Sequence, residues 1–468
     1  MEYNFVSRGL AVLEEEGSPM SEQEVIQSST KQRRNRKINI AKQENGKHTP
    51  TAQYPANDDT EAWKVYWKTQ GQPWRSEPEI SKERQELLAE QRKIKPDAYQ
   101  GIYPFRDINP KLTCADIEWL LATHDNNRGP VDWNDESQRE HKGLDLSGAG
   151  LRDVYLRRLP LAKCVLSYAN LEGADLRNAH LEGAYLEDAH LEGAYLIDAH
   201  LESAGFQGAH LEGAILSVAH LEKAFLYEAH LEGAILHYAN LEGADLRNAH
   251  LEGAYLSAAF FDRATNLEGI VLSKNERDAA SLCDIHWGDV NVAVVDWSTI
   301  SRLGDEKKPK GNKRIFQYEP VVRAYRQLSV VLRNQGINEH AARFSYRAQL
   351  MQRKVFWHDR AYAKWLGSLF IDLLSGYGYK PLRCFAAYLL VILTFAITYF
   401  IIGHKVGPVL SPLGSVIFSM TSFHGRGFFP GGIGLDDPLT VVAALEAFIG
   451  LLIEVTFIAT LTQRLFGR

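Results

Sequence analysis

The dominant pattern in the chain is an apolar residue at every fifth position. Leucine or phenylalanine recurs at this spacing from Leu146 to Phe261, and a small residue, usually alanine, stands two places before most of them. A period of 3.6 would spread these residues around a helix, and a period of two would place alternate ones on opposite faces of a strand. A chain that turns a corner every five residues places all of them inside. Four such sides close a square coil of about 20 residues, and stacked coils hydrogen-bond at a spacing of about 4.8 Å.

The repeat has a specific sequence form. The stretch AYLEDAHLEGAYLIDAHLEG meets the consensus A(D/N)LXX of the pentapeptide-repeat family almost verbatim, and residues 144–261 resemble that family throughout. The resemblance implies a right-handed quadrilateral β-helix, which we assign to residues 144–300. The register slips near Arg263 to Leu272 and resumes loosely from Cys283 to Trp297, which indicates a last coil or cap.

A ten-residue period is superposed on the five-residue one. Histidine recurs at every tenth residue, with Asn170 and Asn240 in the same series, and a glutamate follows two places on. The histidines are His180, His190, His200, His210, His220, His230 and His250. A period of ten in a coil of about twenty places one histidine and one glutamate of each coil on each of two opposite faces. A metal ladder, a pH-responsive face and an acidic docking surface are the functional interpretations. We favour a duplicated decapeptide with solvated polar positions, and assign no metal site.

The residues before the repeat carry weaker signals. Residues 1–110 are polar, contain a basic run from Lys31 to Lys37 and have no sustained apolar period, so we expect an irregular or disordered region. Residues 111–143 are expected to form a helical cap, because Thr113 is a suitable N-cap for a short apolar helix. The N-terminus has no signal-peptide pattern, so we expect this part in the cytoplasm.

After the repeat, two amphipathic stretches separated by Gly336 predict a helical hairpin over residues 315–358. Residues 360–380 predict an interfacial helix that lies on a bilayer. Pro381 and Arg383 then mark the turn into the membrane.

Residues 384–468 predict a membrane module with two spans. Residues 384–403 are uncharged and as long as a hydrocarbon core, and residues 439–461 form a second span that contains Glu446 and Glu454. Basic residues precede the first span and follow the second, which places both termini in the cytoplasm. We therefore expect a multi-pass protein of the inner (cytoplasmic) membrane, in contact with the lipid bilayer.

Between the spans, residues 411–430 run apolar for one short helix and then become glycine-rich. Exposed backbone at membrane depth is tolerated only beside a water-filled path. The order span, half-helix, glycine loop, span resembles the two-transmembrane pore domain of the potassium-channel superfamily. The resemblance implies a homotetramer around one pore, in which filter carbonyls replace the water of a permeant inorganic ion. The pore and filter positions that it implies are Thr421, Ser422, Phe423, His424, Gly425, Arg426, Gly427 and Phe428.

This filter departs from the family sequence TVGYGD. Both glycines are kept, but Arg426 takes the tyrosine position, Phe428 replaces the aspartate and His424 stands where valine is expected. Arginines at a pore mouth raise the entry energy of a cation unless they point away or pair. Two interpretations stay open: a pore that is nonselective, anion-permeable or occluded, or an arginine that packs behind the loop against Glu446 or another acid.

The second span carries three residues of interest. Glu446, Gly450 and Glu454 are four and eight positions apart and share one helix face. Carboxylates inside a membrane are costly and by default functional, and Gly450 corresponds to the glycine at which inner helices of the family bend. We expect at least one glutamate to line or gate the pore; the alternative is burial against Arg426 or an interfacial lysine.

Together these patterns predict a multidomain fold: a right-handed β-helix, an α-helical linker hairpin and a two-transmembrane α-helical pore module. The leading hypothesis is a tetrameric ion channel whose cytoplasmic β-helix senses a signal or docks a protein partner. The alternative is a non-conducting, membrane-anchored scaffold whose β-helix binds a protein. The sequence has no nucleophile–base constellation, phosphate loop or metal motif, so we expect neither an enzyme nor a cofactor. A net charge of -6 suggests no nucleic-acid partner.

Overall fold

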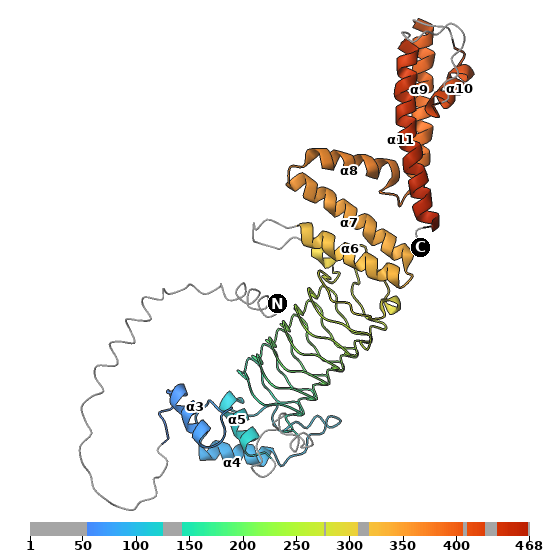
Figure 1. Cartoon of the computed structure of the whole chain (residues 1–468). Helices are drawn as coiled ribbons and strands as arrows, with labels where there is room; N and C mark the ends of the chain where they lie inside the picture. The colour runs from blue at the N-terminus through green and yellow to red at the C-terminus, as the bar shows by residue number, and fades with distance from the viewer. Residues whose placement is uncertain are drawn as a thin grey trace, which may run out of the picture. The chain divides into compact units, whose positions relative to one another are not determined.

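The computed structural model describes residues 54–124, 143–275, 278–307, 318–405, 410–425 and 438–466 (Figure 1). Residues 1–53 of the predicted irregular region and the filter residues Arg426, Gly427 and Phe428 lie outside the described residues.

Residues 55–110 are folded, and the prediction of an irregular region was wrong for this part. Helices α3 (Thr60–Thr69) and α4 (Lys82–Gln91) precede α5 (Cys114–Ala122). Trp63 and Trp67 of α3 are buried, and the guanidinium of Arg75 lies 3.5 Å from the centroid of the Trp67 ring. The indole nitrogen of Trp67 donates to the carbonyl of Glu77 at 2.8 Å. Two stacked tryptophans with specific polar partners hold this segment, and two such positions are too few to give a sustained apolar period.

Helix α5 joins these elements to the repeat. Thr113 and Asp116 cap its N-terminus reciprocally, as predicted for Thr113. The fully buried Glu118 accepts the backbone N–H groups of Ser76 at 2.8 Å and of Glu77 at 3.0 Å. Burial raises the pKa of the Glu118 carboxyl, although these donors oppose the shift.

The first coil of the solenoid is covered by the segment before α5. The backbone N–H of Gly150 donates to the carbonyl of Phe105 at 3.1 Å. The ring of Tyr103 lies 5.8 Å from that of Tyr168. This pairing satisfies part of a coil edge that would otherwise offer unpaired backbone groups to another chain.

The solenoid itself is a stack of square coils. Each bridged residue pairs in parallel with the residue twenty positions on, from Asp145–Val165 to Asn240–Phe260 (Figure 1). Every side of a coil contributes one bridged residue, so the described part of the solenoid contains isolated β-bridges and no extended strand. The expected β-helix is therefore a solenoid whose sheets are ladders of single residues.

Each corner is a turn that begins at a core leucine. In the first of these turns the N–H of Ala149 donates to the carbonyl of Leu146 at 2.9 Å. The third residue of each turn has a positive φ, for example 65° at Gly173 and 56° at Asn178, as type II turns require. The core leucines and alanines are almost fully buried, as the five-residue period predicts.

The predicted slip in register is confirmed. The bridging offset grows to 21 at Asp245–Asn266 and to 26 at Tyr255–Ser281. The last bridge joins Phe260 to His286, and the short helices η2 (Val292–Val294) and η3 (Gly304–Glu306) follow.

Helices α6 (Tyr318–Asn334) and α7 (Asn338–His358) pack against each other and share the solenoid core. The side chain of Gln335 donates to the carbonyl of Val290 at 2.7 Å and accepts the N–H of Val292 at 2.9 Å. Tyr325 accepts the N–H of Leu303 at 2.9 Å. The hairpin is thus hydrogen-bonded to the end of the solenoid.

Four further helices complete the described chain: α8 (Tyr362–Ser375), α9 (Pro381–Lys405), α10 (Pro412–Phe423) and α11 (Pro438–Phe466). Helices α9, α10 and α11 contact one another, and α8 contacts α7, α9 and α11. Along α8, large apolar side chains are exposed, including Leu366, Phe370 and Leu373. That pattern is the one expected of a helix whose apolar side meets lipid.

Candidate functional site

Within the described residues, two helices are long and apolar enough to cross a membrane. The qualifying segments are Leu382–Lys405 with 24 residues and Pro438–Thr462 with 25 residues. At about 1.5 Å per residue, either exceeds the roughly 30 Å of a hydrocarbon core. Large apolar side chains point outward from both, for example Leu390 and Phe448. Length and composition are thus suited to lipid.

Helix α10 lies against both of these helices (Figure 1). Its N-terminus is capped by Ser411, and Pro412 stands at the first helical position. The middle of α10, at Phe418, packs with Tyr399 of α9 and Leu439 of α11. Its last residue, Phe423, packs with Ile392 and Ile453. Helix α10 therefore runs alongside the two long helices and ends beside their middle turns.

Glu446 holds the three helices together. It is fully buried, and the hydroxyl of Tyr399 on α9 donates to its carboxylate at 2.6 Å. The hydroxyl of Ser419 on α10 lies within hydrogen-bonding distance of both Glu446 and the carbonyl of Ile392. Within one chain, Glu446 thus points between its own helices. Its described partners are hydroxyl groups. Both predicted roles, lining the pore and burial against Arg426 or a lysine, stay predictions, because Arg426 lies outside the described residues.

Gly450 is a point of close approach. A Cβ at this position would lie 2.1 Å from the carbonyl oxygen of Phe423 and 2.9 Å from its carbonyl carbon. Only glycine lets the end of α10 come this close to α11. Its predicted role as a hinge stays a prediction.

The third residue of this face, Glu454, contacts His424 just beyond α10. The other imidazole nitrogen of His424 lies 3.2 Å from the hydroxyl of Tyr388 on α9. Glu446, Gly450 and Glu454 therefore share one face, as predicted, and in the single chain that face packs on α10 and His424.

A pocket of ≈ 570 Å³ opens beside this cluster. It is lined by Cys384, Phe385, Tyr388, His424, Ile453, Glu454, Phe457 and Ile458. Its polar groups gather at one place, where the Tyr388 hydroxyl, the His424 ring and the Glu454 carboxylate meet. Such a polar cluster inside an apolar span is the kind of feature that marks ion or proton paths in membrane proteins.

The described filter positions lie at the end of α10. The Thr421 hydroxyl donates to the carbonyl of Phe418 at 3.0 Å, Ser422 and Phe423 are buried, and Gly425 has a φ of 65°. Because Arg426 lies outside the described residues, both interpretations of it stay open.

The start of α9, predicted as the turn into a membrane, is held by Asp372 of α8. Arg383 donates to the carboxylate of Asp372 at 3.3 Å and to its carbonyl at 3.0 Å. Tyr346 and Arg353 of α7 donate to the same carboxylate at 2.9 and 2.8 Å. Pro381 is the first residue of α9. One carboxylate therefore links α7, α8 and the start of α9.

Sequence reasoning missed Tyr388, Tyr399, Ser419 and Asp372. For the first three, the signal in the sequence was hydroxyl groups inside otherwise apolar stretches, such as the series Ser415, Ser419 and Ser422. Their partners depend on how α10 docks, which no local pattern specifies.

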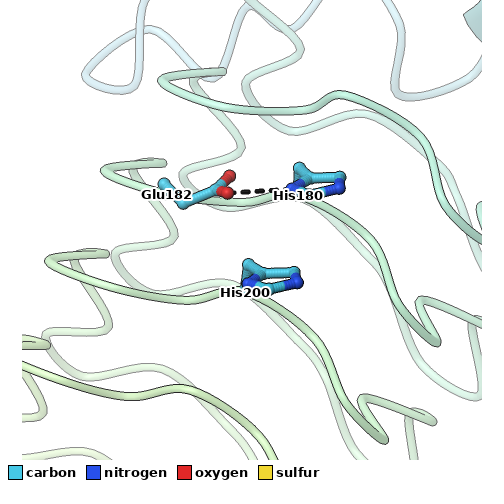
Figure 2. A group of neighbouring side chains, drawn as sticks. All are labelled: His180, Glu182 and His200. Carbon is cyan, nitrogen blue, oxygen red and sulfur yellow. Dashed lines mark hydrogen bonds and ion pairs between the residues drawn. The ribbon is translucent and has the colours of Figure 1, made fainter. Parts of the chain in front are cut away.

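The histidines form two stacked columns on the solenoid. The first histidine column contains His180, His200 and His220, and the second contains His190, His210, His230 and His250. Ring centroids within a column are 4.6 to 5.1 Å apart, and the rings are nearly parallel. Each Nδ1 faces the carboxylate two residues on, at 2.8 Å for His180 and Glu182 (Figure 2). A hydrogen bond with Glu222 raises the pKa of His220, and burial opposes that shift.

Four-sided coils of twenty residues define a quadrilateral β-solenoid. A comparison with family models agrees with this class. The family described as pentapeptide repeats matches in 8 copies, over residues 145–183, 179–217 and 219–253. This part of the chain is made of pentapeptide repeats, so the predicted resemblance is confirmed for it. The resemblance to a potassium-channel pore stays a prediction.

Several solved structures are similar to the repeat part. HetL, a pentapeptide-repeat protein involved in heterocyst differentiation regulation from the cyanobacterium Nostoc, is 30% identical; the match covers 31% of this chain and 78% of HetL, with a TM-score of 0.12. Another Nostoc pentapeptide-repeat protein is 39% identical, over 20% of this chain and 72% of its own, with a TM-score of 0.13. Full-length QnrB1, a plasmid-mediated fluoroquinolone resistance protein, is 17% identical; the match covers 33% of this chain and 90% of QnrB1, with a TM-score of 0.22. No curated protein matches the chain significantly.

Proposed function

We propose that this protein is a membrane ion channel whose C-terminal helices assemble, as a homotetramer, around a pore, with the pentapeptide-repeat solenoid as a cytoplasmic docking domain. The observation that carries the proposal is the position of α10. A short helix packed against two membrane-length helices ends at Phe423, and His424 and Gly425 follow it beside a polar cluster. Free backbone at that depth is stable only next to water or protein.

The hydrogen bonds around Glu446 support this interpretation. They fix α10 to α9 and α11 through groups that would be costly if they faced lipid. A rigidly held half-helix is what a pore loop needs, because the loop that follows it must keep one conformation. Several copies are required, since two long helices of one chain do not enclose a water path.

Reconstitution of the full chain tests the proposal. Purified protein, shown to be tetrameric by light scattering, is placed in liposomes loaded with a fluorescent ion indicator and in planar bilayers. We expect ion flux that Glu454→Gln changes by at least severalfold, because the carboxylate lies in the polar cluster. Glu242→Gln on the solenoid surface is the matched control and should leave flux unchanged. An intact tetramer that carries no current would overturn the channel proposal.

A second candidate function is favoured by one observation. The α11 face that carries both glutamates packs against α10 and His424 of the same chain. With this packing, Glu446 does not face a pore. A membrane-anchored scaffold, in which the solenoid docks a cytoplasmic protein, is consistent with that packing. In the reconstitution experiment, a stable, membrane-embedded and silent protein is the result this candidate predicts.

The proposal includes a membrane orientation and excludes catalysis. Both termini face the cytoplasm of an inner membrane, and ion conduction by the C-terminal helices needs no cofactor. Lys380 just before α9 and Arg383 in its first turn support this orientation, since positive charge is retained on the cytoplasmic side.

A further inference from the structure

The two histidine columns place imidazole and carboxylate groups together repeatedly. In the first column, His180, Glu182 and His200 bring two imidazole nitrogens and one carboxylate oxygen within 4.8 Å of one another (Figure 2). The group His200, Glu202 and His220 repeats this arrangement one coil further on. The second column offers groups with only one histidine and two glutamates, such as Glu192, His210 and Glu212.

A second observation supports a cation-binding role for these groups. In each of these glutamates the second carboxylate oxygen, Oε2, is buried and has no hydrogen-bond partner, as at Glu182, Glu202 and Glu222. Buried polar atoms are nearly always satisfied, and an ion or a water is the usual explanation when the protein supplies no donor. Carboxylates stacked at about one strand spacing also repel one another, so a bound cation would relieve that repulsion.

We propose that the first histidine column binds one transition-metal dication of the zinc class per chain, held by two imidazole Nδ1 atoms and a glutamate carboxylate. Two nitrogens and one oxygen, with an open position for water, form a ligand set that zinc adopts. Imidazole also suits copper, nickel and cobalt, whereas calcium and magnesium prefer oxygen ligands alone.

The ligand atoms must draw closer for this. Zinc binds nitrogen and oxygen at about 2.0 to 2.2 Å, which sets ligand atoms roughly 3.3 Å apart in a tetrahedron. Rotation of the side chains provides this movement, since the rings of His180 and His200 are 46% and 34% exposed. The proton on Nδ1 moves to Nε2 when the metal takes its place, so a neutral imidazole binds without net proton loss.

The first histidine column holds one ion, because its two groups share His200. This histidine belongs to both groups of the column, and its single Nδ1 completes only one group at a time. The second column is weaker, because each group has one imidazole. The ammonium of Lys274 also lies 2.6 Å from Glu252 at its end and supplies a positive charge there.

The sequence suggests a conservative test. Asparagine occupies the same decapeptide position at Asn170 and Asn240, so the coil tolerates it. His200→Asn removes the residue that both groups share. His286→Asn is the matched control, because His286 stacks on Phe260 and belongs to no group that we describe.

The full-length protein in detergent is stripped with a chelator and titrated with ZnCl₂ by calorimetry, and with CoCl₂ by visible absorption. We expect one tight zinc ion per chain, a tetrahedral cobalt spectrum, and at least about tenfold weaker binding in His200→Asn. His286→Asn should match the wild type. A double variant, Glu182→Gln with Glu202→Gln, keeps the stacked rings and is expected to weaken zinc binding as well. It replaces His200→Asn as the test if that variant does not fold. Wild-type binding in folded His200→Asn, or no zinc bound by the wild type, overturns the proposal. Ion flux does not enter any of these measurements.

Discussion

At the scale of single residues, the third position of each turn is where this solenoid is strained. Glycine fills it at many corners, but Val218 adopts a φ of 61° there, and β-branched residues are rarely found in that region. A non-glycine residue in the left-handed conformation costs about 1 kcal/mol or more.

Val218→Gly is therefore expected to raise the stability of the solenoid by about 1 kcal/mol, because it removes this strain. Gly213→Val is the reciprocal change. Gly213 has a φ of 66°, and an added Cβ there would meet only open space. The stability that this variant loses therefore reflects backbone strain alone. Thermal unfolding followed by circular dichroism measures both. Equal melting temperatures for the two variants would contradict the argument.

The five-residue period was enough to place the buried leucines and alanines, because burial at a fixed spacing leaves a direct trace in the sequence. It did not reveal Trp67 or Glu118. The Trp67 indole donates to the carbonyl of Glu77, and Glu118 accepts backbone N–H groups of Ser76 and Glu77. Such contacts leave no periodic trace in the sequence. The filter positions were identified by resemblance alone. Arg426 lies outside the described residues, so its position in the filter stays a prediction.

At the scale of elements, the docking of α10 depends on a few polar contacts within apolar helices. Apolar runs of sufficient length predicted α9 and α11, because the composition of such runs is a strong signal in the sequence. The interaction of Glu446 with Tyr399 and Ser419 was not predictable, because it requires the relative rotation of three helices. Gly450 was noticed in the sequence, but its contact with the Phe423 carbonyl was not.

Glu446→Ala is expected to destabilise the packing of α9, α10 and α11 by about 2 kcal/mol, because it leaves the buried hydroxyls of Tyr399 and Ser419 without their shared acceptor. Glu446→Gln keeps an acceptor oxygen and should lose less. Thermal unfolding of the detergent-solubilised protein, followed by tyrosine and tryptophan fluorescence, compares them. Leu445→Ala, at an exposed neighbouring position, is the control. An equal loss of thermal stability in Leu445→Ala and Glu446→Ala would mean that the hydrogen bonds of Glu446 do not hold the three helices together.

At the scale of the whole molecule, a chain of ion pairs connects the solenoid to the first long helix. Glu306 at the end of the solenoid accepts the guanidinium of Arg347 on α7 at 2.6 and 2.8 Å. Further along α7, Arg353 reaches Asp372, which in turn holds Arg383 of α9. A partner docked on the solenoid would act on the membrane helices through these contacts, provided that they are rigid.

Arg347→Gln tests the first of these links. Burial alone would raise the pKa of Glu306, but hydrogen bonds from Arg347 and Tyr325 outweigh it and hold that pKa below its ordinary value. A depressed carboxyl pKa contributes stability above the unfolded value, here 4.5, which is lost as pH falls through the folded value. We expect Arg347→Gln to cost about 2 kcal/mol at pH 7, and the difference from wild type to shrink below that unfolded value. Hydrogen exchange of the α6 and α7 amides across this pH range measures the link. A penalty that stays constant as Glu306 is protonated would mean that Arg347 acts through packing, and the ion pair would then have no part in coupling the solenoid to the membrane.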